Sequence, residues 1–550
     1  MDLLNKGLMK MLVFSLTIFS LPFLSLGQNI ETGNISGSFQ SDVQYLFPDS
    51  IIGANAVDEN VLSNSFLQLT YQKGQFSAGV RYEAYLNPLL GFDQRYKGQG
   101  LPYRYASYQG DKIEITVGNF YDQFGTGMIF RAYQEWALGI DNSVDGIRVK
   151  FSPAPGFYIK GILGKQRKFF ALSEGILRGA NAELNLNEAI PALKENKTRL
   201  ILEGSVMSKF QKDDDVVLDL PENVSAFSGR ARLIRGGFNL DAEYAYKIND
   251  PFQLNDYVYN SGSGVYVNAN YSQKGLGINV SAKRIDNMDF RSERTVSLQE
   301  LSLSFLPAIS RLHTYRLPTL YPYATQLNGE VGLQASIIYM IPRNTKLGGK
   351  YGTQVAVNYS RISGLDTVFV EPKFRYQSSF LGDLSNLYFE DINVEINRRW
   401  TKNLRTILTY IHLKYNKDII ELGTSSAGKG TVDTHIGILE AQYKISRKVA
   451  IRGELQHMYT KQDLGSWAMA LAELSISPHW YFTVFDEYNY GHPEPDKRVH
   501  YYNLSTAYAF KAHRIGLTYS RQRRGLLCVG GICREVPASN GFSLSITSSF

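Results

Sequence analysis

Long apolar runs are scarce in this sequence, and that scarcity excludes one class of membrane protein. Beyond the N-terminal leader, no continuous apolar stretch reaches the roughly 18 residues that a spanning helix needs, and the mean hydropathy is −0.21. A polytopic helical membrane protein is therefore excluded. Charged residues make up only 20% of the chain, whereas Tyr, Phe and Gly are abundant. This composition excludes a disordered or coiled-coil protein.

Recognisable chemical motifs are also missing. The eight His are scattered and none stands in a metal-ligand spacing. Residues 213–215 are three consecutive Asp without the ligand spacing of a calcium loop. The Gly-Thr-Gly sequence at residues 125–127 is too weak a motif to predict a phosphate-binding loop. No local motif marks a nucleophile. We therefore predict no catalytic, cofactor-binding or metal-binding residues, no cofactor and no enzymatic activity. The net charge of +7 gives no reason to expect a nucleic-acid partner.

The N-terminus predicts export. Lys6 and Lys10 precede an apolar stretch at residues 11–26, and the small residues Ser25 and Gly27 come just before Gln28. This is the order of a cleavable signal peptide, which we assign to residues 1–27. An uncleaved anchor is disfavoured, because the stretch is short and contains Pro and Ser. No Cys lies near the junction, so we expect no lipid-modified N-terminus.

The rest of the chain alternates with a period of two residues. Residues 34–47, 75–85 and 238–246 each place apolar side chains on one face and polar side chains on the other. The same pattern continues to Phe550. Strict alternation predicts strands with one apolar and one polar face.

Connections between these strands alternate in size. Tight turns such as residues 72–74, 235–237 and 511–513 alternate with longer links such as 122–144 and 286–328. Short turns at one end and long loops at the other are typical of an outer-membrane barrel. At roughly ten residues per membrane strand, we predict one all-β antiparallel barrel over residues 28–550, with about 24 strands (range about 20–26). A secreted β-sandwich or β-helix would not require such alternation of the connections.

The alternation also predicts which charged side chains face the lumen. They are Arg81, Glu83, Glu114, Arg148, Lys150, Arg230, Arg232, Asp241 and Glu243. Both signs are present, so these residues could pair across the wall or hold an inserted loop. A channel selective for one sign of ion more often shows one sign at its constriction.

The longest link, residues 286–328, is too apolar and aromatic for a solvated loop. It could fold inward as a plug or bind a partner outside the barrel, and the composition slightly favours the plug. Its arginines would then need carboxylates. We expect these to come from Glu83, Glu114, Asp241 and Glu243 on the lumen face.

The only two cysteines, Cys528 and Cys533, flank a Gly-Gly pair. An exported protein meets an oxidising compartment, so we predict a disulfide that closes this short loop outside the membrane. A redox-active pair is the alternative, but the spacing differs from that of thiol–disulfide exchange enzymes.

Seven sequence blocks stand out, at residues 118–127, 131–133, 138–146, 313–315, 321–326, 348–353 and 528–534. Together these blocks resemble a large family of Bacteroidota outer-membrane barrels that has no assigned activity. The resemblance spans most of the mature chain. It implies a barrel in the outer membrane, and it supplies no catalytic residues.

Two functional hypotheses follow. The first is a porin-like channel for a small solute, or a pore plugged by its own loop. The second is a non-enzymatic scaffold, or a partner subunit of an outer-membrane assembly or protein-secretion complex. Both expect outer-membrane lipid around the barrel, and the second also expects outer-membrane protein partners. The sequence identifies neither a solute nor a partner.

Overall fold

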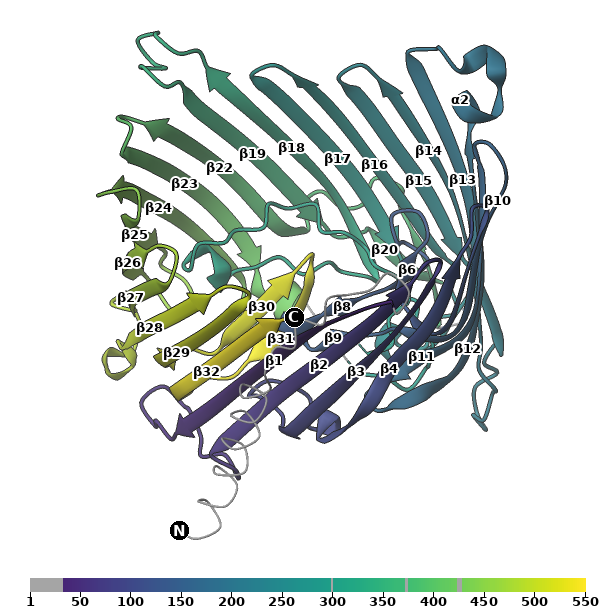
Figure 1. Ribbon diagram of the computed structural model, residues 1–550, viewed down its shortest axis with the longest axis horizontal. Coiled ribbons are helices and arrows are strands. Elements are labelled where there is room, and N and C mark those ends of the chain that lie inside the picture. The colour runs from purple at the N-terminus through teal and green to yellow at the C-terminus, as the bar shows by residue number, and fades with distance from the viewer. Residues whose placement is uncertain (1–32, 298–299, 371–373, 423–427) are drawn as a thin grey trace.

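The computed structural model describes residues 33–297, 300–370, 374–422 and 428–550. The predicted signal peptide, residues 1–27, lies outside these ranges. In the described chain, a 24-stranded antiparallel sheet forms the wall of a barrel (Figure 1). Its strands are β1 (Asn34–Phe47), β2 (Val61–Lys73), β3 (Phe76–Asn87), β4 (Gly98–Gln109), β5 (Ile113–Phe120), β10 (Val144–Ala154), β11 (Phe157–Lys168), β12 (Ala171–Asn185), β13 (Thr198–Phe210), β14 (Asn223–Arg235), β15 (Phe238–Lys247), β16 (Gly262–Gln273), β17 (Leu276–Asp286), β18 (Gly329–Ile341), β19 (Thr353–Ser363), β22 (Leu387–Arg399), β23 (Leu404–Asn416), β24 (Thr431–Lys444), β25 (Val449–Tyr459), β26 (Trp467–Ile476), β27 (Trp480–Tyr488), β28 (His500–Phe510), β29 (His513–Gln522) and β32 (Ser539–Ser549).

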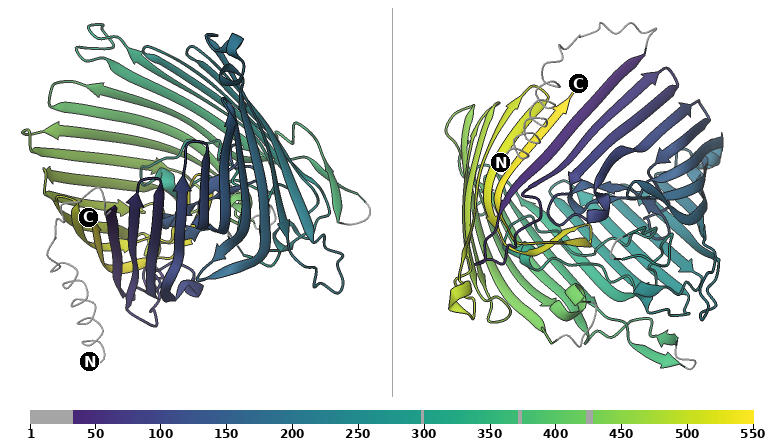
Figure 2. Two further views of the ribbon diagram at one scale, coloured as in Figure 1. Left: turned by 45° about the vertical axis from the view of Figure 1, so that its right-hand side comes forward. Right: turned by 90° about the horizontal axis from the view of Figure 1, so that it is seen from below.

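The barrel closes by pairing its first strand with its last. β1 runs antiparallel to β32, with Ser41 opposite Ile546 and Asp42 opposite Ser545. Purple β1 lies beside yellow β32 in Figure 1 and again in the view from below in Figure 2. Within the described residues, closure leaves the 24-stranded wall without an open strand edge. The predicted barrel class and the strand number of about 24 are confirmed.

The two-residue period becomes the inner and outer faces of the wall. On β23, Leu408 and Tyr410 are 52% and 47% exposed on the outside. Their neighbours Thr409 and Ile411 point inward and are buried. Because successive side chains in a strand point to opposite faces, each strand gives the barrel an apolar outer surface.

Connections differ between the two ends, as predicted. At one end residues 74–75, 155–156, 236–237, 274–275 and 511–512 are tight turns. At the other end the links are longer, including residues 48–60, 121–143, 248–261, 287–328 and 523–538. Residues 186–197 are an exception at the short-turn end, where α2 (Leu186–Ala189) and η3 (Pro191–Leu193) are inserted.

Smaller elements lie within the links. They are β6 (Asp122–Gln123), β7 (Arg131–Ala132), β8 (Gln134–Glu135), β9 (Ile140–Asp141), β20 (Thr367–Val370), β21 (Arg375–Ser378), β30 (Gly525–Val529), β31 (Ile532–Val536), α3 (Lys417–Leu422), η1 (Gln94–Tyr96), η2 (Trp136–Leu138), η4 (Gln253–Asn255), η5 (Pro318–Leu320) and η6 (Pro495–Lys497). Within the described ranges, every helix falls short of the length and apolarity that crossing a membrane would take.

The inner face is not polar throughout, although the alternation predicts that the polar face of each strand lines the lumen. Ile411, Leu413 and Tyr415 on β23 are fully buried on the inside and pack with Ile436 of β24 and Trp467 of β26. Such apolar side chains need a covering layer, because exposure of their surface to water is unfavourable. That layer comes from two of the long links.

Candidate functional site

One long link runs through the interior of the barrel. We call the described residues of this link between β17 and β18, 287–297 and 300–328, the lumen segment. It leaves and re-enters the wall at one place, where the Asn287 amide donates to Asn328 O at 3.1 Å and the Met288 amide donates to Leu327 O at 3.0 Å. Figure 1 shows its teal chain inside the ring of strands.

Apolar side chains hold the lumen segment against the wall. Phe290, Leu303 and Leu306 join an inner cluster that includes Met207 of β13. Further along, Leu317, Tyr321 and Tyr323 join a second cluster, which includes Ile411 of β23 and Trp467 of β26. Burial of apolar area stabilises the folded state by about 25 cal/mol per Å², so both parts of the segment are stabilised in their positions inside the barrel.

Polar contacts fix the second half of the lumen segment to the wall. Arg311 pairs with Glu395 of β22, and His313 Nε2 lies 2.7 Å from Asp391 Oδ2 of the same strand. Arg316 pairs with Glu487 of β27.

The backbone of Leu317 is held as well, because its amide donates to Gln456 Oε1 of β25 at 2.9 Å. These contacts correct the prediction that Glu83, Glu114, Asp241 and Glu243 neutralise the segment. The carboxylates that pair with Arg311 and Arg316 lie on β22 and β27, Arg291 pairs with Asp289 of the segment itself, and the four named residues bind other groups.

The first half of the lumen segment meets the opposite flank of the barrel. Ser292 Oγ donates to Gln166 Oε1 of β11 at 2.7 Å, and Lys168 pairs with Glu293. Arg294 Nη1 donates to Lys212 O at 3.2 Å. Contacts that extend from β11 on one flank to β27 on the other show that the segment spans the lumen.

Two tyrosines of the lumen segment end on carboxylates. The Tyr321 hydroxyl donates to Asp463 Oδ2 at 3.1 Å, and the Tyr323 hydroxyl donates to Glu330 Oε2. Burial, together with the neighbouring carboxylate, raises the pKa of each phenol well above its ordinary value. Both hydroxyls therefore stay protonated at neutral pH and remain hydrogen-bond donors.

A second link also enters the interior. We call residues 121–143, between β5 and β10, the inner loop. Its Asp141 lies in a buried cluster with Arg81, Glu83 and Arg167. Arg81 Nε is 2.7 Å from Glu83 Oε1, and Arg167 Nη1 is 2.7 Å from Asp141 Oδ2. All four side chains are at most 4% exposed. Strand alternation predicts Arg81 and Glu83 on the lumen face, but it does not predict Asp141 or Arg167 as members of this cluster.

The remaining predicted lumen residues pair on the inner face. Arg148 Nη2 is 2.6 Å from Glu114 Oε1, and Lys150 Nζ is 3.1 Å from the same oxygen. Arg230 pairs with Asp241, and Arg232 Nη2 is 2.7 Å from Glu183 Oε2.

Glu243, the last of them, accepts a hydrogen bond from the Thr126 amide of the inner loop at 2.7 Å. The charged residues of both signs on this half of the wall therefore bind one another or the inner loop.

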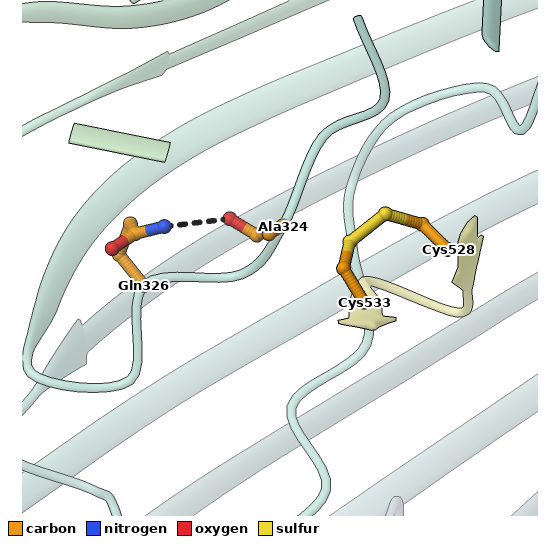
Figure 3. The surroundings of a disulfide bond; sticks show 4 residues. All are labelled: Ala324, Gln326, Cys528 and Cys533. Carbon is orange, nitrogen blue, oxygen red and sulfur yellow. Dashed lines mark hydrogen bonds between the residues drawn. A yellow bond between two sulfur atoms is a disulfide. The ribbon is translucent and has the colours of Figure 1, made fainter. Parts of the chain in front are cut away.

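The disulfide predicted between Cys528 and Cys533 is present and joins β30 to β31. The hairpin does not extend freely outward, because the Thr325 amide of the lumen segment donates to Gly531 O at 2.9 Å. Figure 3 shows the disulfide beside the chain that carries Ala324 and Gln326. The hairpin therefore packs onto the lumen segment.

Replacing both cysteines with serine should loosen this hairpin and leave the barrel intact. A loop this short contributes roughly 2 kcal/mol or less in the chain-entropy model, which is small beside a closed wall. We expect unchanged heat-modifiable migration on gels, with faster proteolysis within residues 523–538. Alkylation of both thiols in untreated intact cells would contradict the disulfide.

A cavity of about 450 Å³ lies between the hairpin, the lumen segment and the link at residues 88–97. Its basic lining residues are Arg311, His313, Arg316, Arg523 and Arg534. Leu89, Phe92, Leu312 and Leu526 supply apolar surface.

Three groups on the outer face could hold a metal ion. His412, Asp433 and His435 bring their ligand atoms within 4.8 Å of one another. They already have partners, since His412 Nε2 is 2.9 Å from Asp433 Oδ1 and His435 Nδ1 is 2.8 Å from the Tyr410 hydroxyl. These hydrogen bonds explain the group without a metal, and the predicted absence of a metal site stays a prediction.

Comparison with known proteins identifies a family. Residues 6–550 match the model of DUF6029, described as a family of unknown function. No curated protein matches the chain.

Among solved structures, the P pilus usher (PapC) translocation pore is 9% identical, with 94% of this chain and 99% of that chain covered and a TM-score of 0.44. The siderophore receptor PirA from Pseudomonas aeruginosa is 10% identical, with 94% and 80% covered and a TM-score of 0.39. OccK8 (OprE) from the same organism is 7% identical, with 94% and 98% covered and a TM-score of 0.35. We take no functional conclusion from these likenesses.

Proposed function

We propose that this chain, which belongs to the family of unknown function DUF6029, is an outer-membrane pore that its own lumen segment closes. A signal peptide over residues 1–27 would export it. Its apolar outer face would meet outer-membrane lipid, and the closed wall satisfies the backbone hydrogen bonds that lipid cannot. The sequence blocks that resemble Bacteroidota barrels support an origin in that phylum.

One observation carries the proposal. The lumen segment is anchored on both flanks of the barrel, by Gln166 at one side and by Glu487 at the other. A barrel with many strands leaves an aqueous channel unless its lumen is filled. Individual ion pairs and hydrogen bonds can open and close, which suits a reversible barrier.

We propose no enzymatic activity and no cofactor for this chain. The alternative function is a scaffold or partner subunit in outer-membrane assembly or protein secretion. The two functions differ in one measurable property, because a pore conducts ions when its barrier is released and a scaffold does not.

Substituting both Glu395 and Glu487 with glutamine should raise the open probability of single channels in planar bilayers. Each substitution weakens a charged hydrogen bond to an arginine of the lumen segment. Such bonds contribute about 1.5–3 kcal/mol each, so we expect open probability to rise at least about tenfold.

Glu390→Gln is the matched control. Glu390 lies on the same strand as Glu395 but binds Arg361 of β19, outside the lumen segment. Its substitution should leave open probability unchanged. Equal effects of control and double variant would contradict the barrier, and a protein found only in the soluble periplasmic fraction would contradict the membrane location.

A further inference from the structure

The cavity beneath the hairpin has an unbalanced charge. None of its described lining residues is Asp or Glu, whereas four are Arg and one is His. Arg311 and His313 are each matched by a wall carboxylate, Glu395 and Asp391 respectively. The remaining three arginines decide what the cavity can bind.

Arg316 and Arg523 share one carboxylate. Both approach Glu487, to which Arg523 Nε lies at 3.4 Å. The Glu487 side chain is fully buried and that of Arg523 is 11% exposed. One carboxylate balances one guanidinium, so this group keeps an excess positive charge next to the cavity.

Arg534 has no carboxylate partner among the described residues. Its Nε donates to Ala137 O at 2.7 Å, and its guanidinium lies 4.7 Å from the ring centre of Phe92. Its Nη1 is buried without a hydrogen-bond partner. Burial lowers the pKa of Arg534, but an arginine stays charged at neutral pH. A buried donor without an acceptor is costly, and an anion would remove that cost.

Most of the other lining residues are apolar or aromatic, and Gln44, Ser310, Thr319 and Gln522 add uncharged polar groups. Phe92, Leu312, Leu526 and Leu527 contribute side chains, and Tyr321 closes one part. Ligand pockets of several hundred Å³ that combine apolar walls with a few fixed polar groups take small organic molecules. Guanidinium groups select the planar or tetrahedral oxyanions of carboxylates and phosphates.

We infer that this cavity binds a small organic anion, which carries a carboxylate or phosphate group on an apolar body. The role of the anion rests on the proposed function, because the anion would be the solute of the pore or the ligand that opens it. Arg534 and Arg523 hold the oxyanion, and Phe92 and the leucines contact the apolar body.

Equilibrium dialysis of the full-length protein in lipid nanodiscs tests this inference. The probes are 3-phenylpropionate and 3-phenylpropylammonium, which share a body and differ in the sign of the head group. We expect the carboxylate to bind at least about tenfold more tightly, since each charged hydrogen bond is worth about a factor of ten or more. Phenyl phosphate as a third probe shows which oxyanion is preferred.

Arg534→Gln and Arg523→Gln should each weaken 3-phenylpropionate binding by about tenfold. Arg524→Gln is the control, because Arg524 is 73% exposed, pairs with Glu535 and does not line the cavity. Arg534→Lys keeps the positive charge but loses the paired N–H donors of the guanidinium. Its affinity for 3-phenylpropionate should therefore lie between those of the wild type and Arg534→Gln. An intact disulfide and unchanged proteolysis of residues 523–538 would show that the hairpin is preserved.

Equal binding of the two phenylpropyl probes would overturn the inference, as would unchanged binding in both glutamine variants. Failure of the pore is a separate result. A protein that binds 3-phenylpropionate but never conducts, even with the lumen segment released, keeps the anion site and loses the proposed function. A protein that conducts without preferring the carboxylate keeps the pore and loses the anion site.

Discussion

Replacing residues 289–326 with a short glycine–serine turn should convert the barrel into a permanently open pore. The Met288 and Leu327 backbones already pair, so a tight turn can join them without moving β17 or β18. Removing the segment empties a lumen that would otherwise be wide enough for an aqueous channel. We expect single-channel conductance to rise several-fold and cells to become sensitive to large antibiotics.

The control replaces residues 343–351, within the link that joins β18 to β19 at the opposite end of the barrel. That exchange also shortens a link but touches nothing in the lumen, so conductance should stay at the wild-type level. The deletion uncovers apolar residues such as Ile411 and Leu413, and heat-modifiable migration must therefore show that the barrel still forms. An inserted deletion variant with unchanged conductance would contradict the barrier and favour the scaffold function.

The wall could be predicted from sequence because its rule is local. Alternation over ten or more residues specifies a strand and its two faces, and Gly-containing turns separate the strands. The rule could not say what covers each face. β23 has apolar side chains on both of its faces, with Leu408 outside and Leu413 inside. The two-residue period alone does not reveal that a segment about a hundred residues earlier in the chain covers the inner face.

The partners of the lumen segment were missed for a similar reason. Carboxylates occur on many inward-facing positions, so charge alone does not distinguish Glu395 from Glu114. The choice is set by where the segment leaves the wall and how its apolar side chains pack, and both are long-range properties. The uneven charge of the cavity at Arg534 was hidden in the same way, since its lining comes from separate links of the chain.

The buried charge cluster shows a further limit of strand periodicity. Arg167 follows Gln166 on β11, and both are buried. Strict alternation forbids this arrangement, but the pairing of β11 with β12 shifts register between Lys165 and Arg167. Such an irregularity places a side chain where the two-residue rule does not expect it. Asp141, the other missed member, lies in the inner loop, to which no period applies.

Asp141→Asn should weaken the attachment of the inner loop to the wall. The substitution leaves Arg81 and Arg167 with Glu83 as their shared carboxylate, in a site from which water is excluded. Breaking a buried ion pair in this way costs about 3–5 kcal/mol. We expect faster proteolysis within residues 121–143 and a lower urea concentration at the midpoint of unfolding, followed by loss of heat-modifiable migration.

Glu114→Gln is the matched control on the same inner face. The Glu114 side chain is 22% exposed, and solvent-accessible ion pairs contribute about 1 kcal/mol or less. A midpoint shift equal to that of Asp141→Asn would contradict the buried cluster.

Single-channel recording of Asp141→Asn then tests which of the two segments closes the pore, because the substitution loosens only the inner loop while the contacts of Arg311 and Arg316 remain. Raised conductance in this variant would make the inner loop part of the barrier, whereas unchanged conductance would assign closure to the lumen segment.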